Sequence, residues 1–349
     1  MNQENKKLLR NLVIELSKNN PDYSLQLGSK LIIYLLFSYD VDEEYYKVDK
    51  DLFDAMRELH MDFEGVSFKD VDISKLDFTK LKNVSINPQE VYEKNLNECV
   101  FTGVTFTGSF DDAYIREADF TDSVNAMIDP ETIKGRDLTS TILCSVEFIG
   151  EFDDTIITLA DFMGSNGAKI DPQMIADKDL SGCVFTDVEF IGEFDETYIQ
   201  GACLMGAKGN ISINPEEIWE QDMSYAILSG VNFIGNFTDS TIVGANFKGS
   251  RGAVINPQEI SDRMLNHCVF EDVTFIGPFD KCTITDSSFK GSTGAVININ
   301  IINGRVGENI DLTDVSFKLG FPKKLMMMNM KEEGSLLFLS IIDNLLKTY

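Results

Sequence analysis

The sequence predicts an all-β solenoid, a quadrilateral β-helix of about twelve coils with helical caps. Two periods in the 349 residues predict this fold: a repeat of 42 or 43 residues and, inside it, a spacing of five residues between large apolar side chains. A period of five fits neither the 3.6 residues per turn of an α-helix nor the two-residue alternation of a strand. It fits a chain that turns a corner at every fifth residue.

The longer period is marked by the phrase Ile-Asn-Pro or Ile-Asp-Pro. It begins at Ile86, Ile128, Ile170, Ile213 and Ile255, and a degenerate copy begins at Ile297. Two columns of phenylalanine keep the same spacing, one at Phe106, Phe148, Phe190, Phe233 and Phe275 and the other at Phe110, Phe152, Phe194, Phe237 and Phe279. Such regularity indicates a stack of equivalent structural units.

The shorter period is clearest in the second copy. Its large apolar centres are Ile128, Ile133, Leu138, Leu143, Phe148, Phe152, Ile157 and Phe162. Small residues stand two positions before the last five centres, at Thr141, Val146, Gly150, Thr155 and Ala160. We expect each centre and its small companion to point inward. Four centres then make one coil, and two coils make one repeat, stacked at about 4.8 Å per coil.

Several five-residue units resemble a known pattern. Ala160-Asp161-Phe162-Met163-Gly164 and Ala245-Asn246-Phe247-Lys248-Gly249 are similar to the units of the pentapeptide-repeat family, and the resemblance extends from Phe63 to Phe317. It implies a right-handed quadrilateral β-helix and a non-enzymatic interaction protein. The family pattern specifies the core and not the surface, so the resemblance assigns no binding residue.

The sequence departs from a regular five-residue pattern in two places. The side between Phe148 and Phe152 is one residue short, and the side between Phe162 and Ile170 is long and ends at the Asn/Asp-Pro corner. Because proline lacks an N–H donor, we expect a bulge or a short helical turn there. On a later side, a long polar side chain replaces the small inward residue, and we expect distortion with that side chain facing out. These residues are Lys94, Arg136, Lys178, Gln221 and Arg263.

Three segments are expected along the chain: a helical N-terminal cap over 1–62, the β-helix over 63–318, and a C-terminal segment over 319–349. Helical spacing of apolar residues predicts helices over 8–16, 30–37, 52–59 and 335–349. The last helix either covers the final coil or forms a homodimer. The N-terminus lacks the pattern of a secretory signal, so we expect a cytoplasmic protein.

No catalytic motif is present, and we expect no enzyme activity, cofactor or metal site. The chain has two histidines and six cysteines. Cys99, Cys183 and Cys268 share one repeat offset that Thr141 and Ala226 fill in other copies, which indicates a small buried side chain rather than a disulfide or metal ligand. Calcium binding is disfavoured because no loop gathers six to eight oxygen ligands.

Acidic residues dominate the surface chemistry. The chain carries 57 acids and 30 bases, a net charge of −27, and 35 of the acids but 12 of the bases fall within residues 86–296. One row of aligned acids is Asp111, Asp153, Asp195 and Asp280, and the following position gives Asp112, Asp154, Glu196 and Asp239. Equivalent acids would lie about 10 Å apart. Such charge disfavours direct binding to nucleic acid or to an anionic membrane and favours a basic protein surface.

Three function classes follow. The sharpest is a DNA mimic that occupies the DNA-binding surface of a topoisomerase such as DNA gyrase, as some pentapeptide-repeat proteins do. The acidic rows could equally serve solubility alone, which leaves a structural or docking scaffold that uses residues 1–62. A carbohydrate-active β-helix enzyme is the remote alternative, because the chain has a single tryptophan, Trp219, and no insertion long enough to build a cleft wall.

Overall fold

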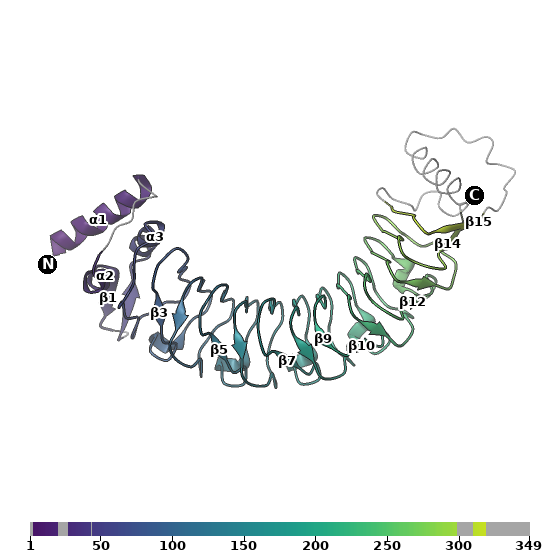
Figure 1. Ribbon diagram of the computed structural model, residues 1–349, viewed down its shortest axis with the longest axis horizontal. Coiled ribbons are helices and arrows are strands. Elements are labelled where there is room, and N and C mark those ends of the chain that lie inside the picture. Colours follow the sequence, from purple (N-terminus) through teal and green to yellow (C-terminus); the bar gives the residue numbers. More distant parts are fainter. Residues whose placement is uncertain (1–2, 20–26, 43, 299–309, 319–349) are drawn as a thin grey trace. The chain divides into compact units, whose positions relative to one another are not determined.

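The computed structural model describes residues 3–19, 27–42, 44–298 and 310–318. The chain divides into two compact units, Met1–Gly192 with Ala207–Gly209, and Glu193–Gly206 with Asn210–Tyr349. Each unit is built from coils of very short parallel strands, and the first unit also carries the N-terminal helices (Figure 1). The segment over 319–349, for which a cap or dimer helix is expected, lies outside the described residues.

Three helices and a hairpin precede the coils. The helices are α1 (Gln3–Asn19), α2 (Ser29–Leu36) and α3 (Lys50–Glu58), in agreement with the helices expected over 8–16, 30–37 and 52–59. Strands β1 (Phe37–Asp40) and β2 (Tyr45–Val48) pair antiparallel between α2 and α3. This hairpin was not predicted from the sequence, because each of its strands has only four residues, too few for a clear alternation of apolar and polar side chains.

Parallel bridges between consecutive coils establish the solenoid. In the first unit Asp77 pairs with Val100, Val100 with Asp119, Asp119 with Ile142, and Ile142 with Asp161. The steps along the sequence alternate between 23 and 19 residues, which together give the 42-residue repeat. The same alternation runs through Asn246, Val269 and Ser288 in the second unit. The predicted all-β solenoid with two coils per repeat is therefore confirmed.

A second face of the coils carries most of the named strands. Three strands form one sheet, in which β8 (Glu189–Phe190) lies between β7 (Lys169–Ile170) and β9 (Lys208–Gly209). The other strands form pairs: β3 (Ser85–Ile86) with β4 (Thr105–Phe106), β5 (Met127–Ile128) with β6 (Glu147–Phe148), β10 (Ser212–Ile213) with β11 (Asn232–Phe233), β12 (Val254–Ile255) with β13 (Thr274–Phe275), and β14 (Val296–Asn298) with β15 (Ser316–Lys318). All of these pairs are parallel. Each strand is short because the chain turns a corner on either side of it.

The interior is a column of the predicted centres. All eight centres of the second copy are buried, and so are four of their five small companions, Thr141, Val146, Thr155 and Ala160. Phenylalanine rings contact one another within and between coils: Phe148 and Phe152 lie 5.0 Å apart, and Phe162 and Phe185 lie 5.9 Å apart between ring centroids. Because each coil contributes a similar side-chain volume, the core is continuous along each unit.

Many of the corners are closed by an aspartate or asparagine immediately before a centre. The Oδ1 atom of Asp119 accepts a hydrogen bond from the backbone N–H of Thr121 at 2.8 Å, and Asp161 accepts one from Met163 at 2.9 Å. Asn246 does the same for Lys248 at 3.0 Å. These contacts are Asx turns, in which a side-chain oxygen replaces the backbone acceptor. Part of the acidic composition is therefore structural.

The Asn/Asp-Pro corner is a turn of this kind with a second contact. Asp129 Oδ1 accepts the N–H of Glu131 at 3.2 Å, and the same carboxylate lies over Gly150 of the next coil. A Cβ atom at Gly150 would be 2.1 Å from Asp129 Oδ1. The same contact recurs for Asn87 and Gly108, Asp171 and Gly192, Asn214 and Gly235, and Asn256 and Gly277. The expectation that Gly150 points inward is thus wrong: it is half-buried and makes room for this carboxylate.

The side with the long polar residues is distorted, as expected. It contains the 3₁₀ turns η1 (Tyr92–Lys94), η2 (Lys134–Arg136), η3 (Ala176–Lys178), η4 (Trp219–Gln221) and η5 (Ser261–Arg263). The last residue of each is left-handed, with φ of +49° at Arg136. None of the five long side chains is buried in the core, and Arg136, whose side chain is 36% exposed, donates from Nη1 to the carbonyl of Asp153 at 2.8 Å.

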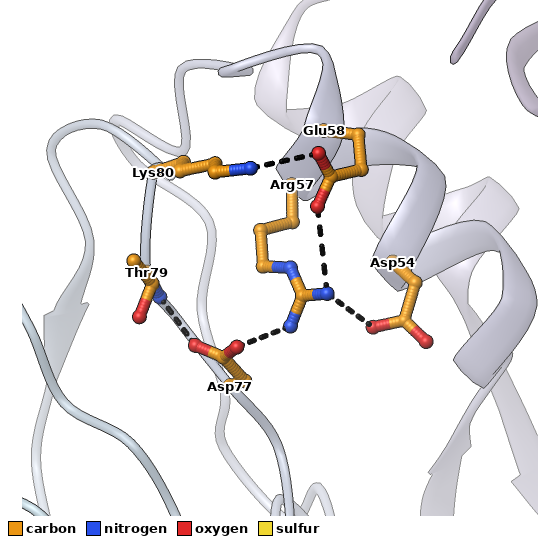
Figure 2. Close-up of polar contacts among 6 residues, drawn as sticks. All are labelled: Asp54, Arg57, Glu58, Asp77, Thr79 and Lys80. Carbon is orange, nitrogen blue, oxygen red and sulfur yellow. Dashed lines mark hydrogen bonds and ion pairs between the residues drawn. The ribbon is translucent and has the colours of Figure 1, made fainter. Parts of the chain in front are cut away.

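Helix α3 is joined to the first coils by a charge network (Figure 2). Arg57 forms ion pairs with Asp77, and with Asp54 and Glu58 at 3.6 Å each. Lys80 pairs with Glu58 at 2.8 Å. The Arg57 side chain is the more buried partner in these pairs, so the network fixes α3 against the corner that Asp77 closes.

A Gly150→Ala substitution tests the glycine contact. We expect it to lower the free energy of unfolding by about 1 to 3 kcal/mol, because the new methyl group collides with the Asp129 carboxylate. The double variant that also carries Asp129→Ala should lose less unfolding free energy than the sum of the losses in the two single variants, since the collision is then removed. Thermal and denaturant unfolding followed by circular dichroism measures both. Additive losses would contradict the contact.

Candidate interaction surface

The predicted acidic row lies at a set of equivalent corners. Each corner follows a buried phenylalanine of the second column, and its second acid has a left-handed backbone, with φ of +58° at Asp112 and +52° at Asp154. The N–H of Asp112 donates to the carbonyl of Thr132 at 2.8 Å, and that of Asp154 to Met174 at 2.7 Å. These ladder bonds fix the backbone of the corners from which the exposed side chains of Asp112 and Asp154 project.

The eight predicted acids are divided between the two units. The first unit contains Asp111, Asp112, Asp153 and Asp154, and the second contains Asp195, Glu196, Asp239 and Asp280. In the second unit the N–H of Glu196 donates to Glu217 and that of Asp239 to Glu259, so those corners are built in the same way. Each unit thus presents its own part of the acidic row.

Basic side chains from the distorted side reach these corners. Lys94 Nζ lies 3.4 Å from Asp112 Oδ2 and donates to the carbonyl of Asp111 at 3.2 Å. Arg136 Nη1 lies 4.0 Å from Asp153 Oδ2. The acidic row of the first unit is therefore partly neutralised from within. This pairing could have been predicted from the sequence, because the basic residue precedes the acids by 17 or 18 positions, which is close to the length of one short coil.

Exposed isoleucines are a second recurrent feature of the surface, and their exposure was not predicted from the sequence. Ile149 and Ile191 in the first unit are 58% and 62% exposed, and Ile234 and Ile276 in the second are 66% and 67% exposed. Each directly follows a buried phenylalanine in the phrase Phe-Ile-Gly. Alternation along the strand places them outward, so the phrase itself was the available signal.

The three aligned cysteines are structural. Cys99, Cys183 and Cys268 are fully buried and reduced. Burial away from water raises the pKa of each of these thiols to about 12, because the thiolate cannot be solvated there. Their Sγ atoms donate to backbone carbonyls, as Cys99 does to Ile73 at 3.0 Å. They fill a small core position, as predicted.

Other site chemistry is sparse within the described ranges. No group of three or more His, Cys, Asp or Glu residues there could hold a metal ion, and no helix there is long and apolar enough to cross a membrane. A hollow of about 610 Å³ lies between α1 and α3 in the first unit. Its charged lining consists of two bases, Arg10 and Lys18, and four acids, so acidic groups predominate; the acids are Glu15, Asp51, Asp54 and Glu58.

These features define a β-solenoid repeat protein. No protein-family model matches the chain, and no curated protein matches it. Among solved structures it is similar to HetL, a pentapeptide repeat protein involved in heterocyst differentiation regulation from the cyanobacterium Nostoc sp. strain PCC 7120. The two share 10% identity over 70% of this chain and 88% of HetL, with a TM-score of 0.17. The fold follows from the ladder and buried centres of this chain, which are consistent with the pentapeptide-repeat resemblance.

The raised thiol pKa values predict selective alkylation. At pH 8 only about one in ten thousand of the Cys99, Cys183 and Cys268 thiols is ionised, so they should resist iodoacetamide while half-exposed Cys144 and Cys203 react. Peptide mass spectrometry with and without denaturant measures this. Because the folded pKa lies above the ordinary value of 9.0, the associated stability is complete below pH 9 and is lost as the pH rises toward 12. Rapid native labelling of the three buried cysteines would contradict the assignment.

Proposed function

We propose that this protein is a non-enzymatic interaction protein whose acidic corners bind a basic surface of a partner. The observation that carries the proposal is the regular placement of exposed carboxylates, such as Asp112 and Asp154, on coils whose backbone ladder fixes them. Fixed charges lose little conformational entropy on binding, so they favour association more than the same charges on a mobile loop.

The sharpest form of the proposal is DNA mimicry directed at a topoisomerase, with DNA gyrase as the first candidate. It is supported by the net charge of −27 and by acids at equivalent corners about two coils apart. The Asx turns reduce the number of acids available for this role, because residues such as Asp119 and Asp161 are committed to corners. The proposal rests on the row set by Asp111, Asp153, Asp195 and Asp280 and on the acids that follow it, Asp112, Asp154, Glu196 and Asp239.

A second candidate is a docking scaffold that uses the N-terminal cap. Helix α1 leaves Leu8 63% and Leu12 52% exposed, one helical turn apart on the same face. The two exposed leucines form a small apolar surface, with the exposed acids Glu4 and Glu15 one helical turn away. The proposal also includes homodimerisation through 319–349 and a cytoplasmic location.

DNA supercoiling by gyrase tests the acidic row directly. The native protein should inhibit supercoiling in a salt-sensitive way, and a variant with Asp111, Asp153, Asp195 and Asp280 changed to Asn should inhibit about tenfold more weakly. A matched control changes Asp119, Asp161, Asp179 and Asp222 to Asn, which removes the same charge and keeps the side-chain oxygen of each Asx turn.

The outcomes separate three accounts. Weaker inhibition by the row variant alone supports the acidic row. Equal weakening by both variants would mean that only net charge matters. Unchanged gyrase activity at every protein concentration would reject DNA mimicry of gyrase and leave the scaffold candidate, for which capture of a partner by the N-terminal cap of the full chain is the next test.

A further inference from the structure

Two exposed isoleucines of the first unit stand on a rigid part of the coil. Ile149 follows β6, and its backbone N–H donates to the carbonyl of Ile128 in the preceding coil at 3.1 Å. Ile191 follows β8, and its N–H donates to Ile170 at 3.1 Å. Both side chains are therefore held outward by the ladder itself, and neither lies on a loop that could fold over it.

The fold does not require isoleucine at this position. In the first copy the equivalent residue is Thr107, which is exposed and donates its N–H to Ile86 at 3.0 Å, as Ile149 does to Ile128. Threonine has the same β-branched preference for strands and exposes less apolar surface. A polar residue at this position thus makes the same backbone hydrogen bond. The ladder alone does not explain why isoleucine recurs in the later copies.

The chemical surroundings of the four isoleucines differ between copies. Ile149 lies two residues from Glu147 and Glu151, and Ile191 lies two residues from Glu189 and Glu193. The corresponding flanks are Asn232 and Asn236 around Ile234, and Thr274 and Pro278 around Ile276. Only the first pair combines exposed apolar surface with negative charge. Glu189 also pairs with Lys169 at 3.3 Å, so the charge at Ile191 is partly balanced.

The spacing of Ile149 and Ile191 is set by the ladder. Glu147 pairs with Asn166 in the next coil, and Lys169 of that coil pairs with Glu189, so the isoleucines are two coils apart. Two coils correspond to about 10 Å. Seven residues of an α-helix rise about 10.5 Å, so a helix that runs along the stack could place one apolar residue of each heptad against each isoleucine.

We propose that Glu147, Ile149, Glu151, Glu189 and Ile191, here called the glutamate–isoleucine strip, dock an amphipathic helix of a partner protein. The helix would carry apolar residues seven positions apart, flanked by Lys or Arg. This inference rests on the proposed function as an interaction protein and specifies the partner. A surface that imitated DNA alone would need carboxylates and no exposed isoleucine, because a DNA-binding groove meets phosphate mainly with cations and hydrogen-bond donors.

A synthetic helical peptide of about three heptads, with leucine at every seventh position and lysine beside it, is a suitable probe. Its binding to the full chain is measured by fluorescence anisotropy. Ile149→Ser with Ile191→Ser should weaken binding by about tenfold. The matched control, Ile234→Ser with Ile276→Ser, removes the same exposed side chains from uncharged surroundings and should change binding by less than about twofold.

Two results would overturn the inference: equal loss of binding in both isoleucine pairs, which indicates general stickiness, or no loss in either pair. Circular dichroism melting confirms that both variants remain folded. The same variants in the gyrase assay separate this inference from the proposed function. One outcome is that gyrase inhibition is lost only when the acidic row is removed and that peptide binding does not change when Ile149 and Ile191 are replaced. That outcome rejects the strip and keeps DNA mimicry. Loss of peptide binding in the Ile149→Ser with Ile191→Ser variant, with gyrase inhibition by that variant unchanged, keeps the strip and shows that gyrase does not bind through it.

Discussion

At many corners of the coil, a backbone N–H is left outside the ladder, and a side-chain oxygen of aspartate or asparagine accepts it. Asp119, Asp161 and Asn246 do so for the residue two positions further on. Because a buried N–H without an acceptor is destabilising, aspartate and asparagine recur immediately before a centre, while Val100 and Ile142 occupy the same position in alternate coils. The five-residue period of the sequence follows from one large inward side chain on each side of the coil.

The same constraint explains why so much of the fold could be predicted from sequence. The inward centres recur because every coil must fill an equivalent cross-section, and all eight centres of the second copy are buried as predicted. What was not predicted depended on contacts between coils. Gly150 is small because it lies under Asp129, a residue 21 positions earlier, and Arg136 donates to the carbonyl of Asp153, 17 positions later. Neither contact belongs to a single five-residue unit.

The surface was less predictable for a related reason. Alignment of the repeats was sufficient to place Asp111 and Asp153 at equivalent corners, since equivalent positions in a solenoid have equivalent surroundings. It did not reveal that Lys94 and Arg136 reach those corners from the neighbouring side, or that Ile149 and Ile191 are exposed. The reach of Lys94 and Arg136 follows from the stacking of one coil on the next, whereas the exposure of the isoleucines follows from alternation along each strand.

The acids of the solenoid thus divide into those that accept a backbone N–H at a corner, such as Asp119 and Asp161, and those that we propose for recognition, such as Asp111 and Asp153. The free energy of unfolding of two matched variants tests this division most directly: Asp119→Ala with Asp161→Ala, and Asp111→Ala with Asp153→Ala. Each removes two negative charges from equivalent places in two successive repeats. We expect the first to lose about 2 kcal/mol, about 1 kcal/mol for each lost hydrogen bond, and the second to change by less than about 1 kcal/mol. Equal losses, or a larger loss in the second, would contradict the division.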